Sequence, residues 1–271
     1  MPLLKKEETN VTPGSEDLDA YTASGRMYQL NAIFTGGTTT SGNSVSLESL
    51  GRVIVERNGT QIFNVPARTL LQMVDEQKGT IEVTTPSGGA TRVVVPIPFW
   101  YPERDPNALN VRNDEELRVE IQPDQSQLST DFDSGGNLKL VSIRAPNTQE
   151  QYVPRILQSR LSFNGSGETD SEELNAAGLV RLFFRETAAD VVGSQGLQVE
   201  WDGRVAVESL DPEVLNDVAN QLNRVESSPD DLFEFNPLSG PGAQGASDSG
   251  AKVTVNSGGA GDLIITRVLQ T

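Results

Sequence analysis

The 271-residue sequence contains neither cysteine nor histidine. Without cysteine the chain has no disulfide framework, no thiol nucleophile and no thiolate metal site. Without histidine it lacks the most common general base, the serine–histidine and cysteine–histidine nucleophile systems, and zinc sites built on imidazole. These two absences argue against most hydrolase mechanisms, and we expect a protein that is not an enzyme.

Long apolar runs and basic residues are also scarce. No run approaches the roughly 20 residues that a membrane-spanning helix needs, and the N-terminal MPLLKKEETN has no apolar core of a secretory signal. Thirty-eight acidic against 21 basic residues give a net charge of −17 at pH 7. Such a surface repels phosphate backbones, so we expect no direct contact with nucleic acid. The balance is typical of an acidic soluble protein, and it also resembles proteins adapted to high salt.

The sequence from Gly25 onward is patterned as β-strands. Short runs rich in Val, Ile, Phe and Tyr, several of them alternating with polar residues, are typical of half-buried strands. Residues 1–24 are polar and unpatterned, and we expect an N-terminal arm there, followed by a first domain over 25–150. The strands expected in that domain are 27–34, 52–57, 60–65, 80–85, 91–100, 116–122 and 138–144.

A hairpin and a helix follow one another in this first domain. Asn58-Gly59 separates two expected strands, and Asn-Gly is the strongest short signal for a β-hairpin. In the next segment, 66–79, Leu70, Leu71 and Val74 recur at helical spacing, which predicts one short amphipathic helix.

Residues 151–271, expected as a second domain, repeat this order. Asp202-Gly203 predicts a hairpin, and the segment 212–224 predicts a helix with Asp211 as its N-cap. The strands expected in this domain are 178–186, 197–201, 204–209, 232–235, 252–256 and 262–269.

The two halves can be aligned with each other. An offset of 144 residues places Asn58-Gly59 on Asp202-Gly203 and Leu70-Leu71 on Val214-Leu215, and an offset of 146 places 116–119 on 262–265. We interpret the repeat as an internal duplication. Two unrelated β segments are the alternative.

A strand, an Asn/Asp-Gly hairpin, a second strand and one short helix, twice in tandem, resemble the coat proteins of tailless icosahedral viruses. The stretches that carry the resemblance are VIVERNGTQIFNVPARTLLQMV and LQVEWDGRVAVESLDPEVLNDV. The chain resembles in particular the double jelly-roll major capsid proteins of the corticovirus and adenovirus-hexon lineage. The related haloarchaeal and thermophilic viruses, whose lattices use two different upright-barrel proteins, fit the same pattern.

The resemblance implies an all-β fold with one short helix per domain, arranged as two tandem jelly-roll β-barrels. It further implies a structural capsid protein of the virion that self-assembles, as a homotrimeric capsomer, beside other capsid and vertex proteins. The shell would enclose an internal membrane around double-stranded DNA. Lys5 and Lys6 are then candidates to face that membrane from the arm, since cations are attracted to anionic lipid surfaces.

Two other functions stay open at this point. A carbohydrate-binding or adhesive surface protein made of two β-sandwiches would be a monomer with an exposed aromatic platform. A polysaccharide-active enzyme would place two carboxyl groups across a groove. Adjacent acids such as Glu115-Glu116 and Asp230-Asp231 are expected to be solvated residues of an acidic surface.

The remaining candidate sites are a dense aromatic cluster and two acidic segments. Phe99, Trp100 and Tyr101 either end a core strand or anchor a subunit contact, where Trp and Tyr are favoured. We expect no cofactor, with calcium as the one cation to consider, but neither acidic segment has the spacing of an EF-hand loop. The string GPGAQG (240–245) matches a dinucleotide fingerprint without the following helix, so a surface loop is expected. The calcium candidates are Asp131 and Asp133, and then Asn164, Glu168, Asp170, Glu172 and Glu173.

Overall fold

The structure is a computed structural model, and its chain divides after Pro154 into two units, Met1–Pro154 and Arg155–Thr271. The boundary expected from the sequence lies after residue 150. The residues that the structure describes are 4–10, 18–22, 24–38, 51–78, 83–84, 90–99, 107–122, 124, 137–145, 147–174, 177–211, 214, 233–235 and 247–271.

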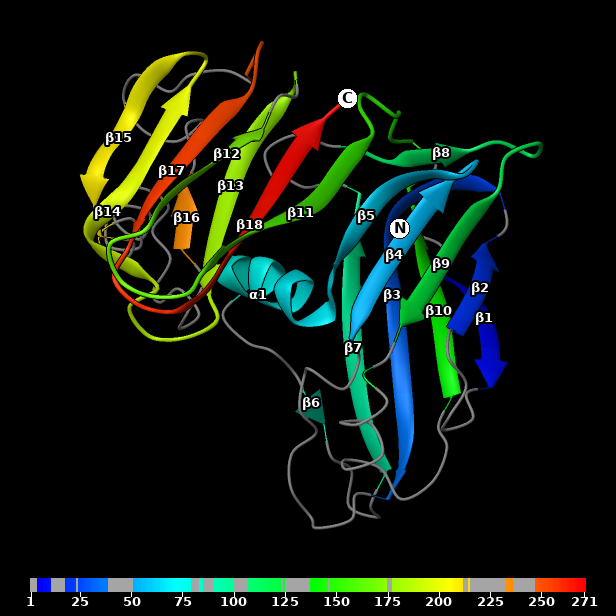
Figure 1. The fold of residues 1–271 in the computed structure, drawn as a ribbon. Helices are drawn as coiled ribbons and strands as arrows, with labels where there is room; N and C mark the ends of the chain where they lie inside the picture. The colour runs from blue at the N-terminus through cyan, green and yellow to red at the C-terminus, as the bar shows by residue number, and fades with distance from the viewer. Residues whose placement is uncertain are drawn as a thin grey trace. The chain divides into compact units, whose positions relative to one another are not determined.

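Unit 1 contains two antiparallel sheets (Figure 1). One has the strand order β1-β10-β3-β7-β6, with β8 paired to β3, and the other has the order β2-β9-β4-β5. The strands are β1 (Leu4–Asn10), β2 (Leu18–Thr22), β3 (Gly25–Thr38), β4 (Arg52–Arg57), β5 (Thr60–Pro66), β6 (Val83–Thr84), β7 (Ala90–Pro98), β8 (Leu109–Val111), β9 (Leu117–Gln122) and β10 (Asn137–Arg144), and the helix is α1 (Ala67–Lys78).

Unit 2 also contains two sheets. Their strand orders are β11-β18-β13-β16 and β12-β17-β14-β15. The pairs β18–β13, β13–β16, β12–β17, β17–β14 and β14–β15 are antiparallel. The strands are β11 (Pro154–Phe163), β12 (Thr169–Leu174), β13 (Leu179–Glu186), β14 (Val192–Trp201), β15 (Arg204–Leu210), β16 (Phe233–Phe235), β17 (Ala251–Ser257) and β18 (Gly261–Gln270).

The two units share one strand topology. Each strand of the order β1-β10-β3-β7 in unit 1 has its counterpart in β11-β18-β13-β16, and each strand of β2-β9-β4-β5 has its counterpart in β12-β17-β14-β15. Counterparts also follow one another in the same chain order. Two antiparallel four-stranded sheets connected in this order form an eight-stranded jelly roll. The prediction of an all-β fold with two tandem jelly rolls is therefore confirmed.

The topology corrects two expectations from the sequence. Residues 4–10 and 18–22, which fall in the expected arm, are strands of the first barrel, because β1 pairs with β10 and β2 with β9, as the counterparts of β11 and β12. Both are edge strands of their sheets in unit 1, where backbone hydrogen bonds hold polar sequences such as LKKEETN that show no apolar alternation. The alignment at offset 146 is also wrong, since the counterpart of β9 is β17 and not β18.

The helix of the first unit confirms the prediction for residues 66–79. It begins directly after the β4–β5 hairpin, and its Leu70 and Leu71 are buried. The helix expected over 212–224 lies outside the described residues apart from Val214, which is helical and whose N–H donates to the carbonyl of Asp211 at 3.0 Å.

An aromatic pair lies in the core of each unit and joins its two sheets. In unit 1, Phe63 of β5 packs edge-on against Phe99 at the end of β7, with ring centroids 5.9 Å apart. In unit 2, Trp201 of β14 packs edge-on against Phe235 of β16 at 5.7 Å. Phe63, Phe99 and Trp201 are fully buried, so these pairs belong to the apolar cores that hold the sheets together.

Candidate functional site

Phe99 is a core residue and not a subunit contact. Its side chain is 0% exposed and packs against Phe63, so no surface of it is left for a second chain. The apolar sequence at the end of β7 therefore enters the core. Of the two interpretations of the aromatic cluster, the end of a core strand is the one that applies to Phe99. Trp100 and Tyr101 lie outside the described residues.

The other candidates from the sequence are separate from one another in the fold. Lys5 and Lys6 lie on β1, opposite Ser142 and Val141 of β10. Asp131, Asp133 and the segment 240–245 lie outside the described residues. Within the described ranges no helix has the length and apolar character to span a membrane.

The acidic segment around β12 does not gather into a metal site. Glu168 accepts a hydrogen bond from the backbone N–H of Asn164 at 3.0 Å, and Asp170 accepts one from the N–H of Ser171 at 2.8 Å. In the described part of the chain, no group of three or more Asp or Glu side chains is close enough to hold a metal ion.

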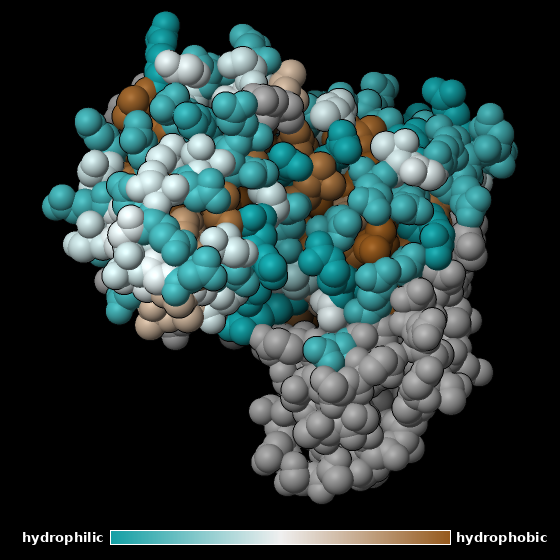
Figure 2. Space-filling model, viewed as in Figure 1, coloured by the Kyte–Doolittle hydropathy of each residue, from teal (hydrophilic) through white to brown (hydrophobic). Residues whose placement is uncertain are grey.

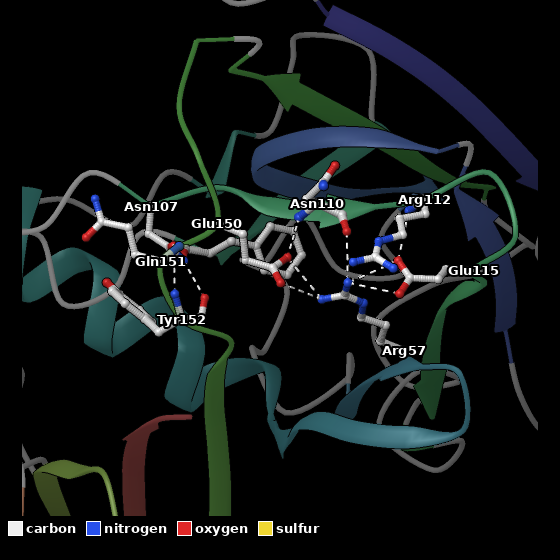
Figure 3. A network of polar contacts seen from close by, with 9 residues as sticks. Arg57, Asn107, Asn110, Arg112, Glu115, Glu150, Gln151 and Tyr152 are labelled. Carbon is white, nitrogen blue, oxygen red and sulfur yellow. Dashed lines mark hydrogen bonds and ion pairs between the residues drawn. The ribbon is translucent and has the colours of Figure 1, made fainter.

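A polar network that the sequence did not suggest ties three segments of unit 1 together (Figure 3). Arg57 at the end of β4 donates to Glu115, which lies between β8 and β9, and to Glu150, which lies in the connector from β10 to β11; both ion pairs measure 3.0 Å. Arg57 also donates to the carbonyl of Asn110 at 2.9 Å, and Glu150 accepts from the N–H of Asn110 at 2.6 Å. The three charged side chains are only 14–24% exposed.

The network favours the ionised forms of Arg57 and Glu115. Burial acts to lower the pKa of Arg57, but the hydrogen bonds and charges of Glu150 and Glu115 outweigh it, and the pKa is raised. The pKa of Glu115 is lowered, chiefly because the N–H of Arg112 donates to it, and further by Arg57; burial opposes these effects. Glu115 is thus an ion-paired residue and not one of the solvated acids that we expected.

Asn107 forms the second part of the network. It is fully buried, and its Nδ2 donates to the carbonyls of Phe99 at 2.6 Å and Tyr152 at 3.0 Å. Its Oδ1 accepts the N–H groups of Gln151 at 2.8 Å and Tyr152 at 3.3 Å. An asparagine amide offers two donor hydrogens and two acceptor lone pairs, so this side chain is fully used. The arrangement holds backbone in place, and nothing in it resembles a reacting pair.

The described surface offers few apolar side chains to a partner. Val205 is 54% exposed and Val214 39% exposed, and neither is aromatic. Val205 lies on β15, an edge strand of its sheet, between exposed Arg204 and Ala206. Figure 2 shows hydrophilic residues over most of the visible described surface, as the net charge of −17 leads one to expect.

No protein-family model matches the sequence, and no curated protein matches it. Solved structures match the fold over nearly the whole chain. The major capsid protein of Sulfolobus turreted icosahedral virus gives a TM-score of 0.69 at 6% identity, covering 99% of this chain and 97% of that chain. The major capsid protein P2 of bacteriophage PM2 gives 0.62 at 12% identity, covering 98% of both chains. VP54 of the virus PBCV-1 gives 0.67 at 11% identity, covering 100% of this chain and 94% of that one. The chain therefore has the double jelly-roll fold of these proteins.

Proposed function

We propose that this chain is a structural major capsid protein that self-assembles into the shell of an icosahedral virus. The observation that carries the proposal is the presence of two jelly-roll units of one topology in a single chain. That arrangement matches capsid proteins over at least 94% of their own length, so it is the whole fold and not one module of it that is shared. The chain acts in the virion by assembly, and no bond is made or broken.

Three copies form one capsomer in this proposal, beside other capsid and vertex proteins. The end of the chain that carries Lys5 and Lys6 faces the internal membrane. Each lysine near an anionic lipid surface contributes roughly 1 kcal/mol to that contact.

We propose that a subunit contact lies on β15 and not at Phe99. Its counterpart β5 buries Ile62, Phe63 and Val65, whereas β15 buries only Val207 among its apolar residues and leaves Val205 54% exposed. An exposed valine on an edge strand gains by being covered when two chains associate. The carbohydrate-binding alternative needs an exposed aromatic platform, and the exposed large hydrophobic residues in the described ranges are the two valines.

The native mass of the purified chain, measured in low and in high salt with negative-stain images, tests the proposal. We expect three times the 29.2 kDa of one chain and larger shells. Assembly should be favoured at about 1 M salt, because the Debye length falls from about 10 Å at 0.1 M to about 3 Å and like-charged chains repel less. A monomer at every salt concentration would contradict the proposal and favour the carbohydrate-binding alternative.

A pair of variants tests the contact on β15. Val205→Asp should shift the chain toward smaller species, because it places a charge in the contact. Ser171→Asp is the matched control, since it adds the same charge at an exposed position of β12, the opposite edge of the same sheet. Equal effects of the two variants would mean that added charge, and not the position on β15, weakens assembly.

A further inference from the structure

The connector between the units, residues 145–153, forms no strand or helix in the described residues, and we call it the strap. A coil of this length that joins two domains is ordinarily a flexible linker, and its composition of Asn, Gln and Pro fits that description. The strap is nevertheless bound to unit 1 at several points along its length. The N–H of Ala145 donates to Arg26 O at 3.2 Å, and Gln149 O accepts from the N–H of Ala108 at 3.4 Å.

Two different kinds of side-chain contact complete this attachment (Figure 3). The amide contact is made by Asn107, which carries no charge and bonds the backbone of Gln151 and Tyr152. The ionic contact is made by Glu150 of the strap, which binds Arg57 at 3.0 Å and the N–H of Asn110 at 2.6 Å.

We propose that these two contacts hold the strap on unit 1 independently, so that either one can be removed while the other stays formed. With both contacts formed, the strap is a fixed part of the first unit. The chain continues from the end of the strap into β11, which begins at Pro154. This inference concerns the chain's own connector and does not depend on the proposed function.

The independence follows from the side chains that make the two contacts. The ionic contact joins Glu150 to Arg57 and to the N–H of Asn110, and the amide contact joins Asn107 to the backbone of Gln151 and Tyr152. The two contacts have no side chain in common. The hydrogen bonds of Glu150 to Arg57 are charge-assisted, and such bonds are about twice as strong as neutral ones.

Amide hydrogen exchange on the full chain, resolved by residue and expressed as protection factors, tests the proposal. The N–H of Asn110 donates to Glu150 and reports the ionic contact; the N–H of Gln151 donates to Asn107 and reports the amide contact. In Glu150→Gln at pH 7, protection of Asn110 should fall about tenfold, the size expected for losing a hydrogen bond to a charged group. Protection of Gln151 should change much less.

Variants separate the two contacts further. Glu150→Gln removes the charge of the ionic contact and leaves the amide contact in place. The control is Glu116→Gln, which removes the charge of the residue that follows Glu115 in the sequence and leaves the ion pairs of Arg57 in place. It should behave as the wild type. Asn107→Ala should expose Gln151 while Asn110 stays protected; because this variant loses a buried residue, Glu150→Gln keeps the test decisive if Asn107→Ala does not fold.

Three results would overturn the inference. The first is free exchange of both amides in the wild type at pH 7, which is the behaviour of a flexible linker. The second is equal loss of protection at Asn110 and Gln151 in Glu150→Gln, which would mean that the two contacts act as one. The third is an effect of Glu116→Gln as large as that of Glu150→Gln.

Discussion

The β4–β5 hairpin of unit 1 and the β14–β15 hairpin of unit 2 occupy the same place in the two barrels. Their turns have the same geometry, with φ of 51° and 75° at Asn58 and Gly59 and of 49° and 71° at Asp202 and Gly203. Positive φ at both central residues defines the type I′ turn that fits the twist of a hairpin. The first N–H of each turn donates to the residue that precedes the neighbouring strand. The N–H of Asn58 donates to the carbonyl of Glu116, just before β9, and the N–H of Asp202 donates to the carbonyl of Gly250, just before β17; both bonds measure 3.0 Å.

The two turns differ in the side chain that strengthens this bond. Asn58 is neutral, and its Oδ1 accepts the N–H of Glu116 at 2.9 Å. Asp202 is a carboxylate, and its Oδ1 accepts the N–H of Ser249 at 2.9 Å and the hydroxyl of Ser247 at 2.5 Å. The backbone bond and the turn type are thus what the barrel requires, whereas the charge of the side chain is free to vary between the units.

The largest effect is expected from truncating the aromatic pair of one unit. Trp201→Ala should lower the free energy of unfolding of unit 2 by about 3–5 kcal/mol, and Phe63→Ala should do the same for unit 1, because each leaves a cavity in a fully buried site. Hydrogen exchange during urea unfolding assigns the loss to a unit. Val205→Ala, at an exposed site, should change stability by less than about 0.5 kcal/mol. Equal loosening of both units by either variant would show that they unfold as one.

An intermediate effect is expected from the turn glycines. Gly59→Ala and Gly203→Ala should each cost about 1–2 kcal/mol, because an L-residue is strained in the left-handed region. A Cβ at either position would meet no atom within 4 Å, so the cost is conformational only and should be equal in the two units. Gly165→Ala is the control, since its Cβ also meets nothing and its φ is not positive. Thermal unfolding measures all three, and unequal costs at Gly59 and Gly203 would contradict the equivalence of the turns.

These turns were predictable from the sequence because Asn-Gly and Asp-Gly dipeptides determine their geometry locally. Strands such as β4 and β9 were predictable for a similar reason, since their apolar residues alternate or run together. The strands β1, β2 and β12 were not, because they lie at sheet edges, where pairing with a neighbour outweighs the polar character of LKKEETN or TDSEEL.

The polar network was not predictable for a different reason. Arg57 lies 58 residues from Glu115 and 93 from Glu150 in the sequence, and each is one charged residue among many. Asn107 lies beside a proline in a polar segment, as a surface loop residue would, yet it is fully buried. Only the fold brings these residues together, so a contact of this kind carries no local signal.

The smallest effect is expected from the charge that distinguishes the two turns. The pKa of Asp202 is lowered, first by the hydroxyl of Ser247 and then by the N–H of Ser249. Folding therefore favours the ionised form, and this contribution to stability is complete above the ordinary aspartate pKa of about 3.9 and is lost as the pH falls through the lower folded value. Asp202→Asn should accordingly flatten the decline of unit 2 stability below about pH 4, measured by thermal unfolding across pH.

The reciprocal variant in unit 1, Asn58→Asp, should change the stability of that unit with pH in the opposite direction. Asn58 lines a surface pocket with Glu56, Glu116 and Arg118, so Asn58→Asp adds a third carboxylate to a site that holds one arginine. Repulsion from Glu56 and Glu116 favours the protonated form of the new aspartate, so the variant should be less stable than the wild type at pH 7 and recover on acidification. If Asn58→Asp instead gained stability above pH 4, as Asp202 does, the two turns would be electrostatically equivalent, and the difference in side chain would have no consequence for either barrel.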